Sequence, residues 1–557
     1  MPHHDRVLTV ARTLGLIALC ACSAQHADKS DNTATDSALV KAPTASPDDW
    51  PSYNRTLAGD RYSPLTEINR ANVAQMHSVC TYTLPEVSSL QTGPIVIGGT
   101  MYFSTDTVTY AVNASTCAMK WLVPRHNPTP SALLVNRGMA YMSGRLFRGT
   151  SDAHVLAMDT ADGHAIWDRV IAAKAPGVTV PMAPIAANGI VFVGNAGGDQ
   201  VAVTGHVYAL DARDGRVVWT FDVVPDSGAA RATWTNSRLP ISGGGFWTSF
   251  TLDTASGVLY VPAGNPAPDF DRRVRTGENL HANSVIALDA ATGRMLGYAH
   301  IVKNDEHDWD VDSPPALITT KSGRPIVASA NKDGLLSVLD RSHLSRRGAT
   351  ASTDPGSMLP VLWQMPTTTR FNADVPLSRD SLTRFCPGIL GGVEWNGAAY
   401  SPATNSIYTG AVDWCVRVQL VRDSLHVPAL GAAWLAAENP QSSMFDPPNA
   451  AKGWVIAFDA ESGNVRWKKA ISHPILAGVT PTAGGLVFTA DLGGELYAFD
   501  ADSGRVLWQT NTGQSTGGGV ITYVAGGRQL LAVASGMKSP VWPGGASQSR
   551  IVVYGLR

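Results

Sequence analysis

A short pattern repeats along the chain and constrains its fold more than any other feature. Each copy is a β-rich run that ends in Ala-x-Asp or a close variant, followed by a short turn that usually contains Gly, and then Trp. Asp accepts hydrogen bonds from turn amides and Gly adopts the positive φ that such turns need, so each copy indicates a β-hairpin. Seven copies are visible, with anchors at Asn113, Asp159, Asp211, Asp289, Asp340, Asp459 and Asp500.

The repeats predict an all-β, eight-bladed propeller of four-stranded antiparallel blades. A small antiparallel sheet cannot bury both of its faces alone, whereas radial stacking of several sheets buries them against one another. The long interval between Asp340 and Asp459 holds a degenerate strand pair around 399–400 and 407–408, which we count as the eighth unit. The recurring Trp residues are expected to supply flat apolar surfaces at the blade junctions.

Composition agrees with this architecture and excludes two classes of protein. Only 16% of the residues are charged, against about 25% in ordinary domains, whereas Gly and Trp number 53 and 15. A hydrophobic content of 44% excludes a disordered chain, and a net charge of −2 argues against nucleic acid as a partner. We therefore expect a single propeller domain over residues 48–557, although the length of 557 residues would otherwise suggest several domains.

The first residues are typical of an export signal. Residues 1–22 contain a short apolar stretch and end in Leu-Cys-Ala-Cys, which resembles a bacterial lipobox with Cys22 as the lipidated residue. Ordinary cleavage near Ala24 is the alternative. Residues 23–47 are small and polar and predict a flexible linker. The expected location is the periplasm, with the lipid anchor as the only attachment to a membrane.

Four cysteines remain after this leader, an even number that fits an oxidising compartment. They allow three pairings, of which the one that closes the shortest loops joins Cys80 to Cys117 and Cys386 to Cys415. The chain contains no Cys-x-x-Cys-His motif, so we expect no covalently attached haem on it.

Candidate site residues lie in irregular segments between the repeats, because propellers place binding sites at strand ends and in insertions. Four segments stand out for their glycines, amides and acids: 193–199, 243–247, 264–268 and 307–312. They include an all-oxygen set of the type that hard cations such as calcium prefer: Asp199, Asn265, Asp310 and Asp312.

At these segments the chain resembles the pyrroloquinoline quinone (PQQ)-dependent alcohol dehydrogenases, which are eight-bladed periplasmic quinoproteins. The resemblance begins at Trp-Pro-Ser-Tyr (50–53) and Arg-Tyr-Ser-Pro-Leu (61–65) and continues through the Trp-containing repeats to 482–488 and 521–523. It covers nearly all of residues 48–557.

The resemblance implies a role for each matching position. Asp310 would be the catalytic base, and the metal, calcium or a lanthanide, would be held by Asp199, Asn265 and Asp310, with Asp312 resembling the extra acid of lanthanide-dependent members. Trp247 would form the floor under the cofactor. The other cofactor-binding positions are Gln91, Arg137, Thr150, Gly197, Gly198, Lys332, Glu394 and Trp395.

Several positions depart from the family pattern. Asp199 stands where the family usually has Glu, Glu394 where it usually has Asn, and the vicinal Cys-Cys over the cofactor is missing. The run 307–312 is one residue shorter than usual, which favours Asp310 as the base and leaves Asp308 as the alternative.

The function expected from the resemblance is oxidation of a small alcohol, or a related hydroxyl or aldehyde compound, by hydride transfer to metal-bound PQQ. Electrons would then pass to a periplasmic cytochrome c or another acceptor. Two alternatives stay open at this point. One is a noncatalytic propeller lipoprotein that serves as a scaffold, and the other is a quinoprotein for a sugar or polymer alcohol.

Overall fold

The computed structural model describes residues 46–127, 133–172, 176–235, 238–344, 359–423 and 426–557. The predicted leader, its Cys22 and nearly all of the predicted linker lie outside the described residues. The described residues belong to one compact unit. Among the described residues, no helix is long and apolar enough to cross a membrane.

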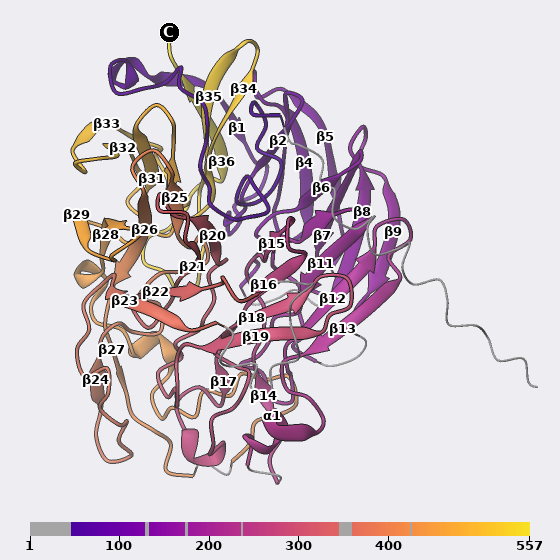
Figure 1. Ribbon diagram of the computed structural model, residues 1–557, viewed down its shortest axis with the longest axis vertical. Coiled ribbons are helices and arrows are strands. Elements are labelled where there is room, and N and C mark those ends of the chain that lie inside the picture. The colour runs from indigo at the N-terminus through magenta and orange to yellow at the C-terminus, as the bar shows by residue number, and fades with distance from the viewer. Residues whose placement is uncertain (1–45, 128–132, 173–175, 236–237, 345–358, 424–425) are drawn as a thin grey trace, which may run out of the picture. The chain divides into compact units, whose positions relative to one another are not determined.

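Eight four-stranded antiparallel sheets form this unit, which confirms the predicted eight-bladed propeller (Figure 1). The first four in chain order are β2 (Ile95–Ile97), β3 (Thr100–Ser104), β4 (Val108–Asn113) and β5 (Met119–Pro124); β6 (Ala140–Met142), β7 (Arg145–Gly149), β8 (His154–Asp159) and β9 (Ala165–Val170); β10 (Ile185–Ala187), β11 (Ile190–Gly194), β12 (His206–Asp211) and β13 (Val217–Asp222); and β15 (Thr251–Asp253), β16 (Val258–Ala263), β18 (Ser284–Asp289) and β19 (Met295–His300).

The other four sheets follow the same order, except for the last. They are β20 (Ala316–Thr319), β21 (Pro325–Ala330), β22 (Leu335–Asp340) and β23 (Val361–Pro366); β25 (Ala399–Ser401), β26 (Ser406–Asp413), β28 (Lys452–Asp459) and β29 (Val465–Ile471); β30 (Thr480–Pro481), β31 (Leu486–Ala490), β32 (Glu495–Asp500) and β33 (Val506–Asn511); and β34 (Val520–Ala525), β35 (Arg528–Ser535), β36 (Arg550–Gly555) and β1 (His77–Thr83).

The count of eight was predicted correctly, but the identity of the eighth blade was wrong. The strand pair at 399–401 and 406–413 belongs to the same blade as the Asp459 repeat, whose hairpin is separated from it by a long insertion. The eighth blade is instead closed by the N-terminal strand β1, which pairs with the last strand β36. Such a pairing joins segments from opposite ends of the chain, so no local repeat predicts it.

Short elements connect the blades. Two two-stranded sheets pair β14 (Ser242–Gly243) with β17 (Pro266–Ala267) and β24 (Thr383–Phe385) with β27 (Val416–Val418). In the described ranges, the helical elements are α1 (Gly228–Ala232) and the 3₁₀ turns Val73–Gln75, Arg272–Val274, Gln441–Ser443 and Pro448–Ala450.

The repeated Trp residues lie at blade junctions, as predicted. Trp167 on β9 pairs across the sheet with Ala157, and its indole N–H donates to the carbonyl oxygen of Ala212 in the turn of the next blade at 3.0 Å. A Cβ on Gly215 of that turn would lie 2.7 Å from the Trp167 ring, so only glycine allows this packing. Trp121, Trp219 and Trp467 make the same bond to the turn that follows each of them.

The first strands of the blades line the centre. The first strands of successive blades contact one another, for example β20 with β25 and β25 with β30, whereas fourth strands such as β5 and β13 alternate between exposed and half-buried residues. The segment 48–63 crosses several of these first strands, because Leu57 and Asp60 accept backbone hydrogen bonds from residues of the fourth and sixth blades.

Both predicted disulfides are present. Cys80 is bonded to Cys117, and Cys386 is bonded to Cys415. The first joins β1 of the eighth blade to the β4–β5 turn of the first blade, and the second joins the β24 and β27 segments.

Candidate functional site

The predicted site residues share one position in the blade topology. Each lies just before a first strand or in the loop between the second and third strands of a blade. In an antiparallel blade these points lie at the same edge of the sheet, so residues from six blades converge at one end of the propeller. Those before a first strand are Gln91, Arg137, Trp247, Asp310, Asp312, Glu394 and Trp395, and those after a second strand are Thr150, Gly197, Gly198, Asp199, Asn265 and Lys332.

Arg137 lies between two indoles in this region. Its guanidinium carbon is 4.6 Å from the ring centre of Trp247 and 5.0 Å from that of Trp395. It donates to the Trp247 carbonyl oxygen at 3.1 Å and to Gln91 Oε1 at 3.0 Å, while its buried Nε has no acceptor. Lys332 approaches the same Trp247 ring, with Nζ 5.5 Å from its centre. Two cations therefore lie against one indole.

Asp310 is held in place by two donors. Lys332 Nζ donates to its Oδ2 at 2.7 Å, and the backbone N–H of Asn265 donates to its Oδ1 at 2.8 Å. A Cβ on Gly264 would lie 2.5 Å from Asp310 Oδ1, so the loop after β16 needs glycine at this position to approach the carboxylate.

A second group of carboxylates lies beside Asp310. Asp199, Asp269 and Asp308 each offer an oxygen, and these oxygens lie within 4.8 Å of one another. Asn265 Nδ2 donates to Asp269 Oδ1 at 3.1 Å, so Asn265 bonds this group through its side chain and Asp310 through its backbone N–H.

Several buried carboxylate oxygens of the region have no hydrogen-bond donor. They are Asp269 Oδ2, Glu394 Oε1 and both side-chain oxygens of Asp312. Residues Asp269, Asp312 and Glu394 are at most 3% exposed. A buried carboxylate without a donor or counter-ion is costly, so this chemistry suits a bound cation.

Burial and mutual repulsion shift the titration of these groups. Burial, followed by the Asp310 charge, raises the pKa of Asp199 to about 6, and the same two causes raise that of Glu394 to about 7 against the opposing effect of Lys332. Burial and then Glu394 raise the pKa of Asp312 well above its usual range. Burial alone would lower the pKa of Lys332, but the surrounding acids, Asp308 first, raise it well above its ordinary value.

Three of the predicted cofactor-binding residues have contacts within the protein itself. The Thr150 side chain binds Asp152 and the carbonyl oxygen of His154, rather than another predicted site residue. A Cβ on Gly197 would lie 2.4 Å from the Gly177 carbonyl oxygen, and one on Gly198 would lie 2.9 Å from the Gly245 backbone nitrogen. The close approach that these glycines permit in the structure is therefore to neighbouring backbone.

Sequence reasoning missed Asp269 and considered Asp308 only as an alternative base. Asp269 follows the 264–268 segment directly, within Pro-Asp-Phe-Asp, and lies in the same loop between second and third strands as Asn265. The shared loop was the signal that could have found Asp269, because residues in one loop between the second and third strands lie at the same end of a propeller.

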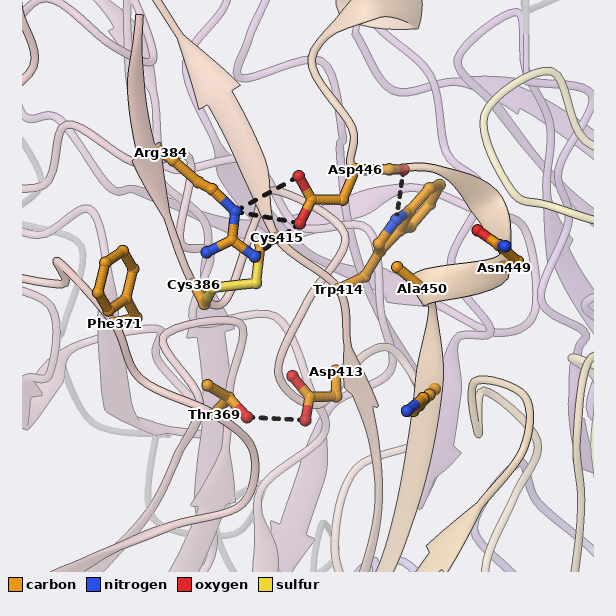
Figure 2. Close-up of a pocket in the computed structure, with 11 residues that line it drawn as sticks. Thr369, Phe371, Arg384, Cys386, Asp413, Trp414, Cys415, Asp446, Asn449 and Ala450 are labelled. Atoms are coloured by element: carbon orange, nitrogen blue, oxygen red, sulfur yellow. Dashed lines mark hydrogen bonds and ion pairs between the residues drawn. A yellow bond between two sulfur atoms is a disulfide. The ribbon is translucent and has the colours of Figure 1, made fainter.

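A separate pocket of about 560 Å³ lies beside the Cys386–Cys415 disulfide (Figure 2). None of the predicted site residues lines it. Its buried Asp446 is neutralised by Arg384 and Arg417, each 2.6 Å away, and Trp414 donates to the Asp446 carbonyl oxygen at 2.9 Å. The Asp446 carboxylate is thus already paired, and the other carboxylate of the lining, Asp413, accepts hydrogen bonds from Thr369 and Trp454.

Comparison with known proteins gives two family matches. Residues 50–343, more than half of the chain, match the family described as "Glucose/ethanol/alcohol dehydrogenase, beta-propeller domain". Residues 451–542 match the one described as "Outer membrane protein assembly factor BamB".

Alignments with individual proteins extend over most of this chain. The chain is 28% identical to a quinohemoprotein alcohol dehydrogenase of Comamonas testosteroni, over 94% of this chain and 75% of that protein. It is 27% identical to a lanthanide-dependent methanol dehydrogenase of Methylacidiphilum fumariolicum, over 88% of this chain and 85% of that protein. The crystal structure of the Comamonas testosteroni enzyme superposes with a TM-score of 0.80 at 24% identity, covering 93% of this chain and 83% of that one, and shows the same fold.

Proposed function

Since the chain belongs to the glucose/ethanol/alcohol dehydrogenase β-propeller family, we propose that it oxidises a small alcohol with PQQ and a metal ion bound at the convergent end of the propeller. The chain is an oxidoreductase of the PQQ-dependent alcohol dehydrogenase type. The observation that carries the finer proposal is the juxtaposition of two cations on the Trp247 ring with a buried group of carboxylates that lack donors.

The residues on the cofactor side fit a planar, anionic ligand. Trp247 supplies a flat aromatic surface, and Arg137 and Lys332 supply positive charge beside it. Arg137 Nε is buried and has no acceptor, so an incoming carboxylate would satisfy it. Gln91, Glu394 and Trp395 surround the same guanidinium, by hydrogen bond, charge and ring contact respectively.

The residues on the metal side fit a hard cation. Asp199 supplies a carboxylate, the Asn265 side chain donates to Asp269 while its backbone N–H donates to Asp310, and Asp312 carries two buried oxygens without donors. We assign the metal, calcium or a lanthanide, to the buried carboxylates around Asp199.

Asp310 is proposed as the base. When bound, PQQ supplies a two-electron acceptor for the hydride of the alcohol carbon, and the metal ion supplies Lewis acidity. Asp310 accepts the hydroxyl proton at Oδ1 or Oδ2 as the carbonyl product forms, and hydrogen bonds from Lys332 and the Asn265 N–H orient its carboxylate. The electrons then leave to a cytochrome c or another acceptor. Location in the periplasm and lipidation of Cys22 remain predictions.

Titration of the purified protein with PQQ, in the presence of calcium or a light lanthanide, tests the proposal. We expect a change in quinone absorbance on binding, and dye reduction with at least one member of a panel of primary alcohols, sugar alcohols and polymer alcohols. Arg137→Met should weaken PQQ binding, whereas Arg384→Met, which removes a guanidinium from the pocket of Figure 2, should not.

Absence of both PQQ binding and dye reduction with every metal would overturn the proposal and favour the scaffold alternative. Activity confined to sugar or polymer alcohols would favour the other alternative.

A further inference from the structure

Three carboxylates from three successive blades meet beside the proposed base. Asp199 follows β11, Asp269 follows β16 and β17, and Asp308 precedes β20. Their oxygens lie within 4.8 Å of one another, a spacing that a single ion can span. The sequence comparison with the family assigned only Asp199 of the three to a metal.

Asp269 carries the evidence that something binds there. Asp269 is only 1% exposed. Its Oδ1 accepts a hydrogen bond from Asn265 Nδ2, whereas its Oδ2 is buried and has no hydrogen-bond donor. Such an oxygen normally has a partner, because leaving it bare forfeits its hydration without compensation.

The neighbouring cationic side chains make their closest hydrogen bonds to groups other than the three carboxylates. Lys332 Nζ lies 2.7 Å from Asp310 but 3.8 Å from Asp308. Arg275 donates to the backbone oxygens of Pro268, Asp269 and Asp305 rather than to the Asp269 carboxylate. Within the described parts of the chain, no ion pair involves Asp199 or Asp269.

We propose that Asp269 and Asp308 act together with Asp199 as carboxylate ligands of a hard, oxygen-seeking cation. This assignment separates two roles that the family resemblance gives to Asp310. The ion lies among the three acids, and Asp310 stays bound to Lys332 and the Asn265 N–H as the proton acceptor. The inference rests on the proposed function only for the role of the ion, since binding of the ion is measurable without PQQ.

Terbium luminescence sensitised by tryptophan tests this assignment on the full-length protein without PQQ. We expect saturable Tb³⁺ binding, displaced by Ca²⁺ if the site also accepts divalent ions. Asp269→Asn and Asp308→Asn should each weaken Tb³⁺ binding by at least about tenfold, because each removes a charged ligand. Folding of each variant is checked by circular dichroism, and since the two lie on different segments, either one that folds is sufficient.

Asp271→Asn is the matched control. Asp271 is also 1% exposed and lies two residues from Asp269, but its carboxylate binds Arg273 and Arg379. Its substitution should leave Tb³⁺ affinity unchanged. Wild-type affinity in a folded Asp269→Asn or Asp308→Asn variant, or no Tb³⁺ binding by the wild type, would overturn the inference.

The test separates this inference from the proposed function. Tb³⁺ binding that depends on Asp269 and Asp308 in a protein that takes up no PQQ would support the cation site and reject the dehydrogenase proposal. PQQ-dependent dye reduction together with Tb³⁺ binding that is unchanged in both variants would support the dehydrogenase proposal and reject the cation site.

Discussion

Buried acids occur in two regions of this molecule, and their surroundings differ. In the pocket of Figure 2, Asp446 is 6% exposed and is bound by two arginines at 2.6 Å. At the convergent end of the propeller, six acids share three nearby cations, Lys332, Arg137 and Arg275; these acids are Asp199, Asp269, Asp308, Asp310, Asp312 and Glu394. Burial of a carboxylate alone therefore does not mark a site, whereas buried carboxylates that outnumber their cations do.

The largest expected effect is on turnover. Asp310→Asn should lower kcat by roughly 10²- to 10⁴-fold, because a positioned base is lost, with PQQ binding retained. Dye reduction by the reconstituted enzyme measures kcat, and quinone absorbance measures binding.

Asp446→Asn is the comparison variant and should keep kcat within a few-fold at a temperature well below its Tm. Unchanged turnover in Asp310→Asn, or an equal loss in Asp446→Asn, would remove the distinction between the two regions. A loss in Asp308→Asn alone would move the role of base to Asp308.

The next effect is on stability in the pocket. Asp446→Asn should lower the free energy of unfolding by about 2 kcal/mol, less than a fully buried pair would lose, because Arg384 and Arg417 are partly exposed and can recover hydration. Urea unfolding measures the change. Stability equal to wild type would mean that the two ion pairs are screened as surface pairs are.

An Asp→Asn substitution among the six acids at the convergent end should instead raise the free energy of unfolding. Asp312→Asn removes a buried carboxylate that has no donor for either oxygen and lies near Glu394 and Asp310. At pH 8, without PQQ or metal, we expect a gain of about 1 kcal/mol in unfolding free energy, seen as a higher Tm. A lower Tm would show that Asp312 is compensated within the protein itself.

The smallest effect concerns pH. Burial and the Asp310 charge raise the pKa of Glu394 to about 7, above its unfolded value near 4.5. The folded protein therefore binds the Glu394 proton more tightly than the unfolded chain does. The contribution of Glu394 to the stability of the fold is complete below about pH 4.5 and is lost as the pH rises through about 7.

Wild-type protein without ligands should accordingly lose up to about 1 kcal/mol relative to Glu394→Gln between pH 6 and 7. Paired Tm measurements across this range detect the difference, and the subtraction cancels the titration of groups that the two proteins share. Parallel pH profiles would show that Lys332 and Arg137, the cations facing Glu394, neutralise it fully.

Much of the fold was readable from local sequence. Asp459 and Asp500 end third strands, and Trp167 and Trp467 lie at blade junctions, because a turn and the strand that follows it are encoded within about ten residues. The disulfides were also correct, since each joins cysteines that are close in the sequence.

The candidate site was only partly readable. Segments such as 264–268 and 307–312 were found because glycines and acids interrupt the strand pattern, and the resemblance to a known family named Asp310 and Lys332. Asp269 was overlooked, since nothing in its own segment shows that two further acids approach it from other blades.

The sequence by itself determined that this chain is a propeller of repeated, Trp-linked sheets, because the repeat encodes hairpins whose faces can be buried only by stacking on one another. The tertiary structure alone decided which acids meet and which segment closes the ring. Asp199, Asp269 and Asp308 come together, and β1 pairs with β36, through contacts between residues far apart in the chain. Local propensity carries no information about such contacts, because they depend on how all eight blades close around one centre.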